Sequence, residues 1–202
     1  SKRQSNVNGP GANGKRRPTE ARRMGSIPPP GSVCCIAWSL SAHAQAVITN
    51  EQLMELHQEI KSSSSMVGAD IIEQEGSHGV LLSREDVGEM ISSADTAIHW
   101  GQHLCRWAVS QDPPVGLRIG VHMGVVRMVE LDNGKLAHIG SCLSTARTLA
   151  DTSISEACVR FLKVTKGYLK RFEGLPFSVS DSGDSYVLEA GLFDDYIGGV
   201  AS

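Results

Sequence analysis

A short apolar run near the start of the chain limits its folds more than any other feature. Residues 33–38 read VCCIAW and hold no polar position, so the run lacks the alternation of a strand with one face in water. It is also far shorter than the roughly 20 apolar residues that a membrane-spanning helix requires. The run therefore predicts a central strand that is buried on both faces of a sheet.

Periodic apolar residues predict two helices in the first half of the chain. The clearer one covers residues 84–109, where apolar side chains recur at three- and four-residue steps and form one broad stripe. The other follows Thr49 or Asn50, either of which can cap it, and ends near Lys61. Both helices are amphipathic, so each is expected to cover a face of the sheet.

Two further helices are expected in the second half. One follows Gly140 and has apolar residues at helical spacing over residues 143–150. The other is predicted by Ser153 and Glu156, which have the spacing of a capping box and precede apolar residues up to Leu162.

The other apolar segments predict strands joined by short turns. These strands are expected near residues 70–75, 78–83, 117–122, 125–131, 135–139, 168–172, 177–180 and 185–190. Gly76-Ser77 would join the first two as a hairpin, and Asp132-Asn133-Gly134 is a strong hairpin turn for the fourth and fifth. The order of elements predicts an α+β domain with a mostly antiparallel sheet covered by helices.

Composition divides the chain into three parts. Residues 1–31 are rich in Gly and Pro and carry seven Lys or Arg against one acidic residue, so we expect a disordered basic tail. Residues 32–190 form the predicted domain, and residues 191–202 are a C-terminal extension. Because the whole chain has a net charge of −3, the domain is acidic. Binding of nucleic acid is therefore not expected, except through the tail.

Targeting signals and cysteine spacing indicate the compartment. The chain has neither a membrane-spanning run nor the apolar core of a signal peptide, which favours an intracellular, cytoplasmic protein. The basic tail also fits a nuclear signal. The five cysteines have no CxxC or Cys/His spacing, so they predict buried reduced thiols and no zinc site.

The segment 117–124, LRIGVHMG, resembles the catalytic domain of class III nucleotidyl cyclases. In that family a strand RIGIHxG precedes a hairpin and then the motif GxxVNxAxR, similar here to Gly140 and the pair Ala146-Arg147. Residues 33–38 are similar to the family's first strand, and residues 68–77 to its GGxxxKxxGD hairpin. The resemblance covers nearly all of residues 32–190 and implies a ferredoxin-like, cyclase-type fold.

The resemblance also implies where metal would be held, and there the chain departs from the family. Class III cyclases use two aspartates to hold two divalent cations. The first position follows the opening strand and is Ser39 here, while the second follows Gly76 and is Ser77. A neutral hydroxyl cannot replace a carboxylate against a hard cation, so no metal and no cofactor are expected.

The positions that read the base and stabilise the transition state are altered as well. The base positions are Glu73, which alone would indicate guanine, and Ala137, whose methyl group cannot read a base edge. The transition-state positions are Ser144 and Thr148 in place of Asn and Arg. Arg147 lies one residue early, about 100° around a helix, and would reach the site only if the helix began one residue out of register.

Two pairs on the long helix have other interpretations. Trp100 and Trp107 are seven residues apart on its polar side and could contact a partner, with core packing as the equal alternative. His99 and His103 have metal-ligand spacing but lack an apparent third ligand, so a solvated helix face is expected.

These departures lead to three hypotheses. The first is a catalytically inactive cyclase-like domain that acts in protein interaction, dimerisation or regulation, as a homodimer or with another cyclase-like domain. The second is a nucleotide sensor that binds ATP or GTP through Glu73 and Arg147 without turnover. The third is a divergent active guanylate cyclase, which Ser39 and Ser77 oppose.

Overall fold

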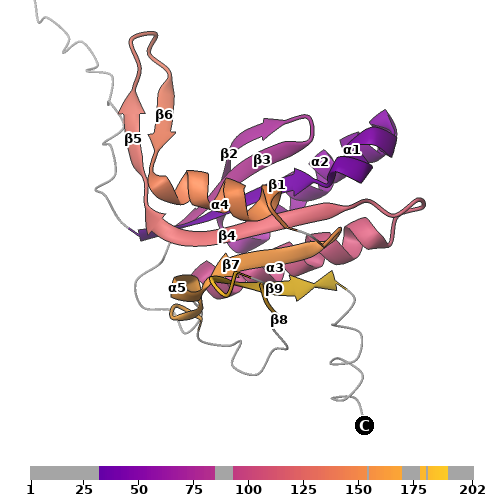
Figure 1. Ribbon diagram of the computed structural model, residues 1–202. Helices are drawn as coiled ribbons and strands as arrows, with labels where there is room; N and C mark the ends of the chain where they lie inside the picture. Colours follow the sequence, from indigo (N-terminus) through magenta and orange to yellow (C-terminus); the bar gives the residue numbers. More distant parts are fainter. Residues whose placement is uncertain (1–31, 85–92, 154, 170–177, 181, 191–202) are drawn as a thin grey trace, which may run out of the picture.

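The computed structural model describes residues 32–84, 93–153, 155–169, 178–180 and 182–190. The tail 1–31 and the extension 191–202 lie outside the described residues, as do residues 85–92 of the predicted helix 84–109. Arg84, predicted as the start of that helix, is instead the last residue of a strand. Within the described parts, one large sheet carries helices on both faces, and a separate two-stranded hairpin projects beyond it (Figure 1). No helix in these segments is both long and apolar enough to cross a membrane.

The sheet is built around the apolar run near the start of the chain. Its strand order is β2-β3-β1-β4-β7-β9-β8, and β1 lies between β3 and β4, antiparallel to both. Only the pair β4–β7 is parallel, so the prediction of a mostly antiparallel α+β sheet is confirmed. The strands are β1 (Ser32–Leu40), β2 (Ala69–Glu75), β3 (His78–Arg84), β4 (Leu117–Val125), β7 (Cys158–Leu162), β8 (Ser178–Val179) and β9 (Ser185–Glu189).

The helices and the projecting hairpin complete the domain. The helices are α1 (Ala42–Val47), α2 (Asn50–Ser64), the 3-10 turn η1 (Ser65–Val67), α3 (Ser93–Val109), α4 (Ser141–Asp151) and α5 (Lys163–Lys166). The hairpin consists of β5 (Arg127–Glu130) and β6 (Leu136–Ile139), joined across the predicted Asp132-Asn133-Gly134 turn. The hairpin β2–β3 is also confirmed, with Gly76 in the left-handed region at φ 47°.

Alternate side chains of β1 supply the cores on the two faces of the sheet. Ile36 and Trp38 belong to the larger core, which also contains the apolar residues of α2 and α3. Cys35 and Ala37 belong to a smaller core beneath α4. Both faces of this strand are therefore buried, as its continuous apolar sequence predicts.

Close approach of α4 to the sheet depends on Gly120 in β4. A Cβ atom at this position would overlap the carbonyl oxygen of Ala146 and lie 2.7 Å from the backbone nitrogen of Ala150. The helix backbone therefore rests directly on the strand. Gly120 thus has a packing role that determines the position of α4.

The predicted helix that ends at Leu162 is wrong. Residues Cys158–Leu162 form β7, which pairs with β4 on one side and β9 on the other. The Ser153 hydroxyl lies 2.7 Å from the Cys158 sulfur instead of capping a helix. Pairing with two distant strands outweighs a local capping pattern because it satisfies the backbone and buries Val159 and Phe161 completely.

Smaller differences concern helix ends. The sequence did not predict α1, whose first turn is capped by the Ser41 hydroxyl, which accepts from Ala44 N at 3.1 Å. Helix α2 continues past Lys61 to Ser64, and the Ser63 hydroxyl there donates to the Glu59 carbonyl at 2.7 Å. Tyr168, expected at the start of a strand, lies in a turn after α5, and residues 170–172 are not described.

Candidate functional site

A cavity of about 250 Å³ lies where the end of β1 meets the β2–β3 hairpin and α4. Its walls come from four parts of the chain that are far apart in sequence. The lining residues are Ala37, Trp38, Ser39, Gln45, Glu73, Ser77, His78, Gly79, Arg147, Ala150 and Asp151. Four of the residues singled out by the cyclase resemblance are therefore brought together: Ser39, Ser77, Glu73 and Arg147.

Strand pairing places the two serines at the same end of the sheet. Ser39 is opposite His78 in the β1–β3 register, and Leu40 N donates to the Ser77 carbonyl at 2.9 Å. Ser39 is almost fully buried, and Ser77 is half-buried. Both positions in the cavity that the resemblance assigns to metal carboxylates thus carry neutral hydroxyls.

The residues around these serines do not fit a divalent cation. Across the segments that the structure describes, no group of three or more His, Cys, Asp or Glu side chains is placed to share a metal ion. Asp151 and Glu73 line the cavity from different elements, but Glu73 is already paired with a cation of the protein itself. Oxygen-rich coordination of a hard cation is therefore not provided here.

Glu73 forms an ion pair with Arg147 across the cavity. An Arg147 guanidinium N–H donates to a Glu73 carboxylate oxygen, and His78 Nε2 lies 3.7 Å from the other carboxylate oxygen. The pair joins β2 to α4, and its side chains are 30% and 41% exposed. The charges of Glu73 and Arg147 thus neutralise each other, while Asp151 adds a further carboxylate to the cavity wall.

A β-bulge explains how Glu73 reaches this face of the sheet. Ile71 pairs with Leu81 and Glu73 with Val80, so Ile72 is an extra residue in β2. Ile71 packs on the larger core, whereas Ile72 packs on the smaller core beneath α4. Without the bulge, alternation would send Glu73 to the face of Ile71. The alternation of the sequence contains no signal for this shift.

Arg147 reaches the cavity although it lies one residue before the family position. On α4, Arg147, Ala150 and Asp151 line the cavity, while Ser144 and Thr148 are exposed. The Ser144 hydroxyl donates to the Ser141 carbonyl at 2.9 Å, within its own helix turn. Ser144 and Thr148, which the resemblance places at the transition-state positions, are thus small polar residues on the exposed side of α4.

Ala137 is the remaining position from the resemblance, and it does not join the others. It pairs with Val129 in the β5–β6 hairpin and does not line the cavity. Sequence reasoning missed Gln45, whose Nε2 donates to the Leu40 carbonyl at 2.9 Å, because α1 was not predicted. It also missed Asp151, although its position four residues after Arg147 placed it on the same helix face.

The tryptophans on α3 belong to the core, which was the alternative interpretation. Trp100 is 3% exposed, and its Nε1 donates to the Ser63 hydroxyl at 2.8 Å. Trp107 is partly buried against the larger core. The predicted partner-binding stripe is therefore wrong for Trp100, because α2 and η1 cover that side of α3. His103 Nε2 lies 2.9 Å from a Glu59 carboxylate oxygen on an exposed part of the surface.

All five cysteines are buried thiols that form no disulfide, as their spacing predicts. Burial raises the pKa of the Cys35 thiol above its ordinary range, with further contributions from the hydrogen bond to Cys142 and its charge. Burial also raises the pKa of Cys105 and of Cys158. These groups stay protonated at neutral pH and cannot serve as nucleophiles.

Comparison with known proteins identifies the fold. No protein-family model matches the chain, and no curated protein is similar in sequence. Solved structures do match. The monomeric guanylyl cyclase domain of the RhoGC fusion protein from the aquatic fungus Blastocladiella emersonii has a TM-score of 0.63 at 17% identity, covering 78% of this chain and 94% of that one.

Two other cyclase structures give the same result. The guanylate cyclase domain of RhGC from Catenaria anguillulae, solved with GTP, has a TM-score of 0.57 at 15% identity and covers 77% of this chain and 93% of its own. The adenylyl cyclase CyaB from P. aeruginosa has a TM-score of 0.60 at 14% identity, with 78% and 94% covered. The chain therefore has the fold of a class III nucleotidyl cyclase catalytic domain.

Proposed function

We propose that this chain is a catalytically inactive cyclase-like domain that acts by binding protein, as a homodimer or together with another cyclase-like domain. The observation that carries the proposal is the cavity in which Ser39 and Ser77 replace carboxylates and Glu73 is paired with Arg147. The cyclase fold is retained around a cavity in which Glu73 and Arg147 are already paired with each other.

The projecting β5–β6 hairpin supports a role in association. Ile139 and Val129 lie on one face of the hairpin and are 55% and 40% exposed, while Leu136 on the other face is 57% exposed. A small hairpin with apolar side chains on both faces has no core of its own. Burial of these side chains against a second chain would stabilise an assembly.

The fold neighbours make both a monomer and a dimer reasonable expectations. The guanylyl cyclase domain of the Blastocladiella protein has been solved in a monomeric and in a dimeric form. For this chain we expect concentration-dependent self-association through the hairpin, because the exposed apolar area there would otherwise remain in water.

A nucleotide sensor is the second candidate, and the cavity with Glu73 and Arg147 is the observation that favours it. A nucleotide would have to break the ion pair before either side chain could contact it. Calorimetry of the full chain with ATP, GTP and their cyclic products distinguishes the two functions. We expect no binding at millimolar ligand, and clear binding that is lost in Arg147→Gln would favour the sensor.

An activity assay tests the absence of catalysis. The full chain is incubated with GTP or ATP and with Mg²⁺ or Mn²⁺, and cyclic nucleotide is measured. We expect no product above that of a heat-inactivated sample, because no carboxylates stand at the two metal positions. Turnover that disappears in Glu73→Gln would show an active guanylate cyclase and would overturn the proposal.

Sedimentation velocity tests the role of the hairpin. The Ile139→Lys variant puts a charge on the hairpin, and Val164→Lys on α5 is the matched control, since the two native side chains are 55% and 56% exposed. We expect Ile139→Lys to shift the chain to monomer while the control still associates. Equal association of both variants would place the interface elsewhere.

A further inference from the structure

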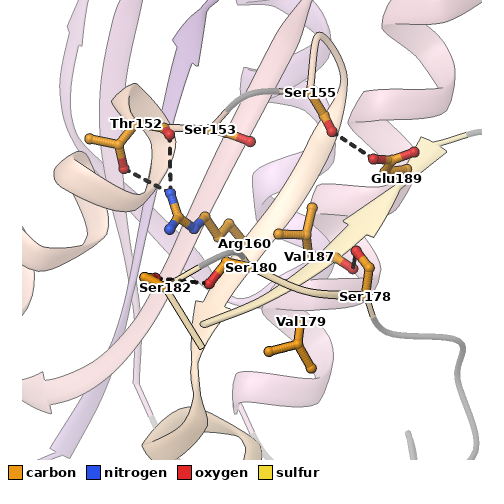
Figure 2. A pocket seen from close by; sticks show the side chains of 10 residues that line it. All are labelled: Thr152, Ser153, Ser155, Arg160, Ser178, Val179, Ser180, Ser182, Val187 and Glu189. Atoms are coloured by element: carbon orange, nitrogen blue, oxygen red, sulfur yellow. Dashed lines mark hydrogen bonds between the residues drawn. The ribbon is translucent and has the colours of Figure 1, made fainter. Parts of the chain in front are cut away.

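A second cavity lies beside the C-terminal end of α4 and shares no lining residue with the first. It has a volume of about 390 Å³ and is formed by the end of α4, by β7 and by the β8–β9 hairpin (Figure 2). Arg160 enters it from β7, and hydroxyl groups make up much of the remaining wall. Neither the cyclase resemblance nor the proposed function gives this cavity a role.

Within the described segments, the Arg160 guanidinium donates to neutral oxygens only. Its Nε donates to the Ser185 hydroxyl at 2.8 Å, and its Nη1 donates to the Thr152 hydroxyl at 2.8 Å and to the Thr152 carbonyl at 3.2 Å. Among the described residues, no carboxylate lies within ion-pair distance of this guanidinium. A guanidinium has five N–H donors, so donors remain for a ligand.

The hydroxyl groups extend this donor surface. The Ser180 and Ser182 hydroxyl oxygens lie 3.1 Å apart, and the Ser185 hydroxyl donates to Ser180 at 2.9 Å. Of the described residues that line the cavity, Glu189 is the acidic one, and it accepts from the Ser155 hydroxyl at 2.7 Å. Figure 2 shows Ser155 and Glu189 on the other side of the cavity from the Arg160 contacts with Thr152.

We propose that this cavity binds the phosphate group of a small phosphomonoester, with Arg160 as the principal contact. Because Nε and Nη1 already donate to Ser185 and Thr152, the Nη2 group of Arg160 remains to donate to a phosphate oxygen. The serine hydroxyls can donate to the other phosphate oxygens. The cavity lies near the lower end of the roughly 300–1,000 Å³ range of small-molecule sites, which is more than a bare anion fills. Val179 and Val187 offer apolar contact to the carbon part of the ester.

Calorimetry of the full chain at constant ionic strength tests the proposal with three probes. These are glycerol phosphate, inorganic phosphate and uncharged glycerol. We expect glycerol phosphate to bind in the millimolar range or more tightly, inorganic phosphate to bind more weakly, and glycerol not to bind. Absence of binding by both phosphate probes, or equal binding of glycerol and its phosphate, would overturn the proposal. Binding of inorganic phosphate but not of glycerol phosphate would overturn the proposal of a phosphomonoester ligand and indicate a simple anion site.

Variants show whether the phosphate group lies on Arg160. Arg160→Gln is expected to weaken glycerol phosphate binding by about tenfold or more, since a charge-assisted contact is lost. Arg147→Gln is the control, because it removes a guanidinium from the other cavity and should leave binding unchanged. Equal losses in both variants, or no loss in a folded Arg160→Gln protein, would contradict the assignment.

Two milder variants keep the test decisive if the loss of the Arg160 contacts to Thr152 and Ser185 unfolds the chain. Ser182→Ala removes a hydroxyl that is hydrogen-bonded to Ser180, and it should weaken glycerol phosphate binding severalfold. Glu189→Gln removes the acidic charge and should strengthen it. The proposal would be overturned if neither variant changed the affinity for glycerol phosphate in the expected direction. The cyclase and association experiments have separate readouts, so their failure would leave this cavity's result unaffected.

Discussion

The carboxylate of Glu73 and the guanidinium of Arg147 form an ion pair in the wall of the first cavity. They come from residues 74 apart in sequence and connect β2 to α4. Since Arg147 is 41% exposed, water and salt screen the pair, and its contribution to stability is modest. The pair occupies both side chains on which the hypothesis of a nucleotide sensor depends.

The strength of this pair can be measured with a double-mutant cycle. Urea denaturation of Glu73→Gln, Arg147→Gln and the double variant should give a coupling energy of about 0.5 kcal/mol at low salt. The coupling should fall as salt is added, because the pair is partly exposed. A coupling of zero at low salt would show that the two side chains do not interact in solution.

Gly120 sets the distance between α4 and the sheet, and it can be tested by a single methyl group. Gly120→Ala places that group against the backbone of α4, so the free energy of unfolding should fall by about 1–3 kcal/mol or more. Gly167→Ala is the control, since its nearest neighbour is the Val164 carbonyl at 3.3 Å and its φ is −62°. Equal stability of the two variants in urea would contradict the close packing of α4.

The start of α2 illustrates how an element is stabilised by its own sequence. The Thr49 hydroxyl accepts from Gln52 N at 3.1 Å, and Gln52 Oε1 accepts from Thr49 N at 3.2 Å. Gln52 Nε2 also donates to the Pro113 carbonyl at 3.1 Å and so ties the helix to the loop before β4. This capping box was predicted in part, since Thr49 was one of two expected caps.

Removal of the cap should destabilise the domain measurably. Thr49→Ala should lower the free energy of unfolding by about 1 kcal/mol, because Gln52 N loses its acceptor. Thr49→Ser keeps the hydroxyl and should stay within a few tenths of a kcal/mol of the native protein. Thermal or urea denaturation measures both, and equal losses would show that the methyl group, not the cap, matters.

β7 is the element that sequence periodicity assigned wrongly. Its residues 158–162 come after Ser153 and Glu156, which have the spacing of a capping box. Nothing in this segment taken alone requires a strand. The outcome depends on two neighbours, β4 and β9, that lie far away in sequence. The second cavity exists only because β7 is a strand, since this places Arg160 on the same face of the sheet as the end of α4.

At the scale of the whole molecule, the buried thiols and His122 limit the pH range of stability. Burial raises the pKa values of Cys35, Cys105 and Cys158, so these groups favour the folded state below the ordinary thiol pKa and oppose it as the pH rises further. Burial lowers the pKa of His122, so the folded state loses stability as the pH falls through the ordinary histidine range.

Stability should therefore be highest between about pH 6.5 and 8.5, the ordinary pKa values of histidine and cysteine. Urea midpoints measured from acid to alkaline pH should fall on both sides of this window. A thiol reagent at pH 8 should label no cysteine in the native chain and all five after denaturation. Rapid labelling without denaturant would contradict the burial of these side chains.

The sequence by itself determined the features that depend on neighbours along the chain. The apolar run 33–38 defined the buried β1, and turn residues defined the hairpins β2–β3 and β5–β6. It also determined that hydroxyls stand at Ser39 and Ser77, because residue identity needs no coordinates. Periodicity and turn chemistry are local, so these predictions were confirmed.

Only the tertiary structure decided the features that join distant segments. A bulge in β2 turned Glu73 toward α4, and the observed helix register brought Arg147 to meet it. Strand pairing made β7 a strand and left Arg160 facing a hydroxyl-lined cavity. Such contacts depend on which strands pair and how closely a helix packs. Neither property has a period or a motif that can be recognised along the chain.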